Sequence, residues 1–124
     1  MTERQEVYRR PYYPRASHRA KHEAGKMNKT ERAFADILEA RRLTGEVLEW
    51  AFEPEKFRLA DNTFYTPDFR VIFADEMVMF FEVKGHWEDD ARVKIKVCAE
   101  QHPYPFRAIK MVKGRAVEEK IGRI

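Results

Sequence analysis

The sequence is poor in the residues that bind structural metals or form disulfides. Its single cysteine, Cys98, excludes an internal disulfide framework, and no spacing of cysteine and histidine indicates a zinc site. No apolar run approaches the roughly 20 residues of a membrane span, so we expect no membrane partner. The first residues are polar and charged, unlike those of a secretory signal peptide. These absences favour a soluble protein of the cytoplasm.

Size and composition predict one folded domain. A chain of 124 residues is long enough for one hydrophobic core but not for two domains. Hydrophobic residues make up 44% of the chain and include nine phenylalanines, which argues against disorder over its whole length.

Basic residues are concentrated at the start of the chain. Residues 1–27 contain seven basic and three acidic residues, a net charge of +4, whereas residues 28–124 contain 17 basic and 18 acidic residues, a net charge of −1. This asymmetry is typical of a protein that binds an anionic polymer. Five cations of the arm are candidates for contacts with nucleic acid: Arg9, Arg10, Arg15, Arg19 and Lys21. A solubilising tail, or one that packs against a second subunit, is an equal alternative.

Residues 1–27 show no helical or strand period, so we expect this basic N-terminal arm to be poorly ordered by itself. Residues 28–124 form the predicted folded domain. A helix is predicted from Asn28, because Asn28 and Glu31 fit a capping box, and Gly45 is a suitable terminator. Residues 48–52 then alternate as in a strand.

Two longer apolar segments, residues 64–74 and 77–84, predict central strands covered on both faces. Asp75 and Glu76 separate them as a hairpin loop. Residues 91–97 are ambiguous, since they alternate as in a strand but follow acidic residues that suit a helix N-terminus. Residues 106–112 predict a last strand, and residues 117–124 a short helix or a tail.

Two carboxylates and a lysine lie on the two central segments: Asp68, Glu82 and Lys84. Glu82 and Lys84 are two residues apart and project from the same face of a strand. A carboxylate pair can hold a hard divalent cation such as Mg²⁺, which needs few protein ligands besides water and phosphate. A neighbouring lysine can orient a water molecule or stabilise charge on a phosphate oxygen. These are the groups that phosphodiester hydrolysis requires.

The hairpin loop decides whether these side chains meet. With a two-residue loop, residue 68 would pair with residue 83, and Asp68 would lie on the sheet face opposite to Glu82 and Lys84. A shared metal therefore requires an odd loop, such as one of three residues, or a bulge in one strand.

Pro67-Asp68 and Glu82-Val83-Lys84 resemble the PD-(D/E)xK signature of the restriction-endonuclease-like nuclease superfamily. A longer ordered set resembles a small phage-associated family of predicted endonucleases: residues 28–31, 52–54, 64–69, 82–85 and 90–96. This resemblance covers roughly residues 28–109. It implies an α/β fold with a restriction-endonuclease-like core, in the order α-β-β-β-α-β, and a mixed sheet flanked by helices. It also favours a helix for residues 91–97.

The resemblance implies a metal-dependent endonuclease that hydrolyses DNA, encoded by a phage and acting in the host cytoplasm. Asp68, Glu82 and the backbone carbonyl of Val83 would hold Mg²⁺ or Mn²⁺. Lys84 would position the attacking water, and Glu31 would complete the acidic cluster. Small phage enzymes with this core include Holliday junction resolvases, usually homodimers, so branched DNA and a second copy of the chain are further expected partners.

Each of these assignments has a structural alternative. Glu31 is fully explained as the capping-box partner, and Glu82 with Lys84 could form a structural ion pair. Three further cations are candidates for DNA contacts, although a solvated charged face is the commoner meaning of such a run: Arg92, Lys94 and Lys96. The alternative function is a non-catalytic module on a nuclease-like fold that binds nucleic acid or a protein.

Overall fold

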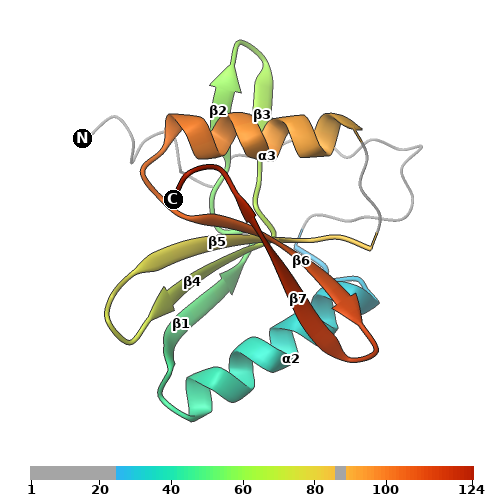
Figure 1. Ribbon diagram of the computed structural model, residues 1–124, viewed down its shortest axis with the longest axis vertical. Coiled ribbons are helices and arrows are strands. Elements are labelled where there is room, and N and C mark those ends of the chain that lie inside the picture. Colours follow the sequence, from blue (N-terminus) through green and yellow to red (C-terminus); the bar gives the residue numbers. More distant parts are fainter. Residues whose placement is uncertain (1–24, 86–88) are drawn as a thin grey trace.

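The computed structural model describes residues 25–85 and 89–124 and has an α/β fold. A five-stranded sheet in the order β1-β4-β5-β6-β7 lies between two helices (Figure 1). Only β5 and β6 are parallel neighbours, so the sheet is mixed. The elements follow the chain in this order: α2 (Lys29–Leu43), β1 (Val47–Phe52), β2 (Phe57–Ala60), β3 (Thr63–Tyr65), β4 (Phe69–Phe73), β5 (Val78–Val83), α3 (Asp89–Gln101), β6 (Phe106–Val112) and β7 (Arg115–Ile121).

The first helix begins as the sequence predicts. The backbone N–H of Glu31 donates to Oδ1 of Asn28 at 2.8 Å, and the backbone N–H of Asn28 donates to Oε1 of Glu31 at 2.9 Å. This reciprocal pair is a capping box, which satisfies two N–H groups that have no partner within the helix. Gly45 follows the last turn with a φ of +91°, a conformation that glycine adopts without strain.

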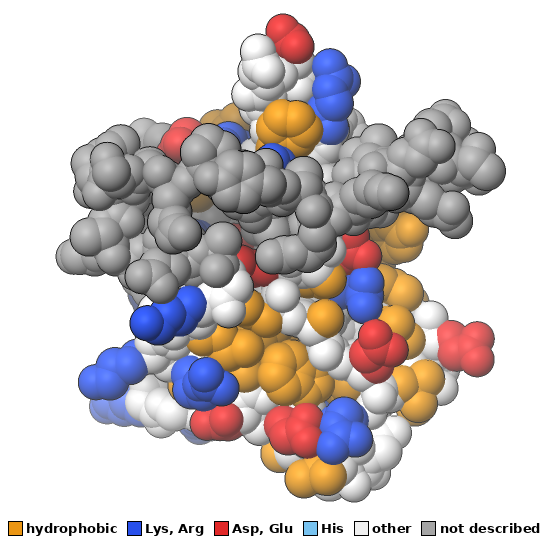
Figure 2. Space-filling model, turned by 180° about the vertical axis from the view of Figure 1, so that it is seen from behind, with side chains coloured by type: hydrophobic (Ala, Val, Ile, Leu, Met, Phe, Trp, Pro, Cys, Tyr) orange, Lys and Arg blue, Asp and Glu red, His pale blue; other side chains and the backbone are white. Residues whose placement is uncertain are grey.

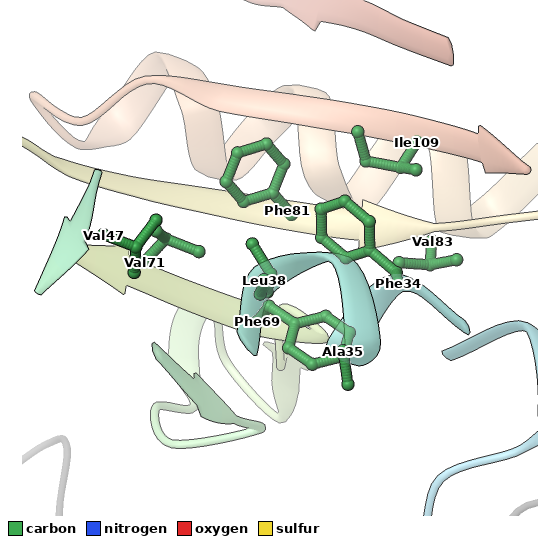
Figure 3. Close-up of a cluster of buried hydrophobic side chains, with 9 residues drawn as sticks. All are labelled: Phe34, Ala35, Leu38, Val47, Phe69, Val71, Phe81, Val83 and Ile109. Carbon is green, nitrogen blue, oxygen red and sulfur yellow. The ribbon is translucent and has the colours of Figure 1, made fainter. Parts of the chain in front are cut away.

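Each face of the sheet buries its own hydrophobic cluster. On one face, Phe34 and Leu38 of α2 pack against Phe69 of β4 and Phe81 of β5, as Figure 3 shows. The rings of Phe34 and Phe69 meet edge to face, with centroids 5.4 Å apart. The two central strands are therefore anchored to α2 close to the residues that carry the predicted chemistry.

The opposite face packs against α3 and the small β2–β3 sheet (Figure 1). Ile95 and Cys98 of α3 are fully buried against Phe80 and Phe106 of the main sheet. The helical prediction for residues 91–97 is therefore confirmed. Its apolar residues face the sheet at helical spacing, whereas a strand would have presented alternate residues to it.

The predicted strand over residues 64–74 is wrong in one respect. The structure divides it into β3, which pairs with β2 in a separate two-stranded sheet, and β4, which belongs to the main sheet. Thr66, Pro67 and Asp68 lie between them outside any strand. Proline has no N–H to donate to a strand ladder, so the chain leaves one sheet at Pro67 and enters the other after Asp68.

The prediction of a helix or tail at the C-terminus is also wrong. Residues Arg115–Ile121 form β7, antiparallel to β6, so β6 is not the last strand. Val112 pairs with Arg115 across a two-residue turn in which Lys113 and Gly114 have φ values of 53° and 79°. Positive φ at both turn residues matches the twist of a hairpin. Pairing with β6 therefore outweighs the weak strand character of this charged segment.

Over residues 25–85 and 89–124, neither helix has the length and apolar character that crossing a membrane requires. Several large hydrophobic side chains are nevertheless exposed. Leu43 at the end of α2, Leu48 on β1 and Met77 just before β5 are each about half exposed or more. Seen from behind, hydrophobic side chains gather on the lower half of the molecule among acidic and basic ones (Figure 2).

Candidate functional site

The β4–β5 hairpin has the odd loop that a shared site requires. The backbone N–H of Phe73 donates to the carbonyl of Met77, and the N–H of Glu76 donates to the carbonyl of Phe73, so residues 74–76 form a three-residue loop. Glu76 has a φ of 72°, as expected for the last residue of such a loop. Phe69 consequently pairs with Phe81, and the same register places Asp68 level with Glu82. The predicted loop parity is confirmed.

Asp68 lies buried where the chain enters β4. Its Oδ2 accepts a 2.8 Å hydrogen bond from the backbone N–H of Val83, which ties the carboxyl group to the end of β5. Burial raises the pKa of Asp68 well above its usual range, and repulsion from Glu82 and Glu31 raises it further. The Val83 bond and the charge of Lys84 oppose this rise only in part. Asp68 therefore holds a negative charge at a cost that a cation would reduce.

Glu82 is buried on the same face of the sheet but has closer polar partners. Its Oε1 accepts a 2.7 Å hydrogen bond from the hydroxyl of Tyr65, and its Oε2 lies 3.1 Å from Nζ of Lys84. Burial raises the pKa of Glu82, while the charge of Lys84 and the Tyr65 hydrogen bond lower it, with a net rise. The structural ion pair that was one alternative for Glu82 and Lys84 is therefore present.

Lys84 follows β5 directly and is less buried than the two carboxyl groups. Burial lowers the pKa of Lys84, but attraction to Glu82, the hydrogen bond with it and the charge of Asp68 outweigh this, so the net pKa is raised. The side chain therefore stays an ammonium group at neutral pH. Its role in chemistry is that of a cation and hydrogen-bond donor, because it does not act as a base in this state.

Glu31 reaches the same region from the first turn of α2. Its side chain is only 5% exposed, and its charge raises the pKa values of both Asp68 and Glu82. One of its oxygens is used in the capping box with Asn28. The capping role of Glu31 is therefore confirmed, and its position beside the pair leaves a second role to be tested.

The donor set suits a cation with few protein ligands. Within residues 25–85 and 89–124, no group of three or more acidic, histidine or cysteine side chains is arranged to hold one ion. The two buried carboxyl groups of Asp68 and Glu82 form a smaller oxygen set, to which the sequence adds the backbone carbonyl of Val83 as a predicted ligand. Mg²⁺ and Mn²⁺ fit such a set, because Mg²⁺ keeps several water ligands and commonly takes only one or two carboxylates. Repulsion between the carboxylates is the feature of this structure that a cation would relieve.

The three predicted DNA-contacting cations that the structure describes, all on α3, do not share one side of the helix. On α3, Arg92 forms an ion pair with Glu119 of β7 at 2.7 Å. Successive helical residues are turned by about 100°, so Lys94 lies on a different side of the helix from Arg92 and Lys96. The five predicted cations of the arm lie outside the described residues: Arg9, Arg10, Arg15, Arg19 and Lys21.

Two residues of the site had no assigned role from sequence. Tyr65 is buried, and its hydroxyl needs a polar partner, which it finds in Glu82. In the sequence, the position of Tyr65 three residues before Asp68 was the signal that could have indicated a role in the site. Glu53 is also buried, has a φ of 52°, and accepts a 2.8 Å hydrogen bond from the backbone N–H of Gly25. No sequence signal reveals that contact, which joins residues 28 positions apart.

Comparisons of the chain with protein-family models, with curated proteins and with solved structures found no match. The resemblance to phage-associated endonucleases therefore stays a prediction. The functional argument depends on the geometry around Asp68, Glu82 and Lys84.

Proposed function

We propose that this protein is a Mg²⁺- or Mn²⁺-dependent endonuclease that hydrolyses phosphodiester bonds in DNA. The observation that carries the proposal is the register of the β4–β5 hairpin, which sets buried Asp68 level with buried Glu82 on one sheet face. Lys84 contacts Glu82 on the same face. Isolated buried carboxylates destabilise a fold, so their juxtaposition is typical of a functional site.

The roles follow from the chemistry of each group. Asp68, Glu82 and the carbonyl of Val83 would hold the ion, and Glu31 would contribute through a water molecule. When bound, the ion would supply Lewis-acid stabilisation of the charge that develops on the phosphate. Lys84, as an ammonium group, orients the attacking water and adds a second positive charge next to the phosphate oxygens. Tyr65 fixes the carboxylate of Glu82 through its hydroxyl.

The order of elements also supports a nuclease. Without the β2–β3 insertion and the additional strand β7, the chain runs α2, β1, β4, β5, α3 and β6. This is the α-β-β-β-α-β order that the resemblance implies for a restriction-endonuclease-like core. The homodimer is part of the same proposal: β1 is an edge strand with β4 as its one neighbour in the described sheet, and Leu48 on it is 54% exposed.

One observation favours the alternative, a non-catalytic module that binds nucleic acid or a protein. Both oxygens of Glu82 already have partners, one in Tyr65 and one in Lys84. A purely structural ion pair would look the same. The two functions differ in their dependence on metal ions, because only the nuclease needs a metal ion to cleave DNA.

The decisive experiment incubates the purified protein with labelled single-stranded, duplex, flap and four-way DNA, each with Mg²⁺, Mn²⁺ or EDTA. The nuclease predicts cleavage of at least one substrate with either metal and none with EDTA. Preferential cutting of the four-way DNA would identify a junction resolvase. Glu82→Gln should abolish cleavage while a circular dichroism spectrum shows an intact fold. Binding of DNA without cleavage under every metal condition would favour the non-catalytic module.

A further inference from the structure

A cavity of about 400 Å³ adjoins the candidate active site, and none of the chemistry above uses it. It begins at Lys84 and Gly85, which follow β5, and extends over residues 108–110 of β6 to Val117 and Glu119 of β7. Lys84 belongs to both sites. The cavity therefore lies where a polymer bound across the active site would continue.

The strand register places a second lysine beside Lys84. In the parallel pair β5–β6, Glu82 aligns with Ala108 and Val83 with Ile109. The next positions in this register are Lys84 and Lys110. Both lysines line the cavity. Within the described part of the chain, Lys84 is paired with Glu82, whereas no acidic side chain forms an ion pair with Lys110.

The rest of the lining suits the same kind of ligand. Ala108 and Val117 supply aliphatic surface, against which a sugar ring can pack. Among the described residues of the lining, Glu119 is the one that is acidic and would repel an anion, but Arg92 neutralises it through a 2.7 Å ion pair. Lysine recognises phosphate as a compact positive charge. A cavity with two ammonium groups and an aliphatic wall fits one sugar-phosphate unit.

We propose that this cavity binds the nucleotide next to the cleaved bond, with Lys110 as the ligand of its phosphate. The inference depends on the proposed nuclease function for the identity of the polymer. Arg92 then acts indirectly, as the residue that keeps Glu119 from opposing the phosphate, and it does not itself contact DNA.

The test measures DNA affinity of the full chain at several salt concentrations in EDTA, where no cleavage occurs. Each lost phosphate contact should reduce the slope of log K against log salt by about 0.9 for duplex or about 0.7 for single strands. Lys110→Ala should lose one such contact, and Lys110→Arg should retain it. The matched control is Lys120→Ala. Lys120 is an exposed lysine of the same hairpin; it lies opposite Arg107 in the strand register and projects from the other face of the sheet.

The variant Glu119→Gln distinguishes DNA binding in the cavity from attraction of DNA to the general surface charge. If the cavity holds phosphate, this variant binds DNA at least as tightly as the wild type, and Arg92→Ala binds more weakly because Glu119 loses its partner. An unchanged salt slope in Lys110→Ala would overturn the inference even if the protein cleaves DNA. If the slope is reduced in Lys110→Ala but the protein never cleaves DNA, the result would support strand binding in the cavity and contradict the nuclease function.

Discussion

The two hairpins of the main sheet differ by one residue in their loops, and that residue decides what their strands can do. The β4–β5 loop has three residues and brings Asp68 level with Glu82, whereas the β6–β7 turn has two and pairs Ala108 with Glu119 and Lys110 with Val117. A shift of one residue would move every side chain to the opposite face. Loop length therefore acts as a functional determinant in the first hairpin.

The acidic side chains of the two hairpins lie in opposite electrostatic environments. On β6 and β7, acidic side chains are exposed and paired, Glu119 with Arg92 and Glu118 with Arg107. Beside β4 and β5, burial raises the pKa values of Asp68 and Glu82, and repulsion from Glu31 raises both further. A fold keeps such an unfavourable pair when function requires it. The comparison locates the destabilised part of the molecule in the candidate active site.

Among changes that leave the two carboxylates in place, the largest effect should follow the loss of the lysine beside the first hairpin. We expect Lys84→Ala to slow single-turnover DNA cleavage by about 100-fold or more, because the developing charge loses a preorganised donor. Mn²⁺ affinity should change much less, since the carboxylates remain. Lys29→Ala, which alters an exposed lysine at the start of α2, is the control. Wild-type cleavage rates in Lys84→Ala would exclude a role for this lysine in turnover.

Removal of the Tyr65 hydroxyl should have the next largest effect. The hydrogen bond from Tyr65 lowers the pKa of Glu82, so Tyr65→Phe should raise that pKa further and move the acid limb of the cleavage profile to higher pH. The free energy of unfolding should fall by about 1.5–3 kcal/mol, the range for a hydrogen bond to a charged group. Tyr104→Phe, whose ring packs on Phe80, is the control. An acid limb at the same pH in both variants would contradict this role.

The charge of Asp68 should lower stability in a pH-dependent manner. Because the folded state raises its pKa above the ordinary 3.8, the proton is held more tightly in the folded chain. The stabilising contribution of this proton is complete below about pH 3.8, and it is lost as the pH rises through the pKa that Asp68 has in the folded chain. In EDTA, Asp68→Asn should therefore gain stability relative to the wild type across this window. Chemical denaturation at a series of pH values measures the gain, with exposed Asp36→Asn as control; a parallel pH dependence in all three proteins would refute it.

The smallest effect should appear in the turn of the second hairpin. Lys113 adopts a φ of 53°, which asparagine tolerates better than lysine. Lys113→Asn creates an Asn-Gly turn and should stabilise the chain by up to about 1 kcal/mol. Glu76→Asn is the matched change in the first hairpin, where φ is 72°. Destabilisation by both changes in denaturant titrations would show that turn conformation does not limit stability here.

Sequence reasoning predicted the start of the first helix and the register of the central hairpin because both depend on local patterns. Asn28 and Glu31 carry a capping signal within four residues, and the parity argument needed only the distance between Asp68 and Glu82 along the chain. The structure confirms the capping box and the odd loop. Both features are fixed by short-range geometry, which a single sequence retains.

The errors concern features that depend on distant partners. Residues 115–121 are mostly charged and show little strand character, yet β6 holds them in the sheet. The Lys113-Gly114 pair was the one local signal for that hairpin. The division of residues 64–74 depends on the pairing of β3 with β2, for which the turn residues Asp61 and Asn62 are the local signal in the sequence. The contact of Glu53 with Gly25 is of the same kind.

The most direct test of the metal-dependent site is the single-turnover cleavage rate of Asp68→Asn with Mg²⁺ on the best substrate of the DNA panel. Asparagine keeps the shape of the side chain and can still accept the hydrogen bond from Val83, so only the charge is lost. The account predicts that Asp68→Asn loses at least about 100-fold in rate while folding normally, and that Asp36→Asn cleaves at the wild-type rate. Cleavage by Asp68→Asn at the wild-type rate would contradict the central claim.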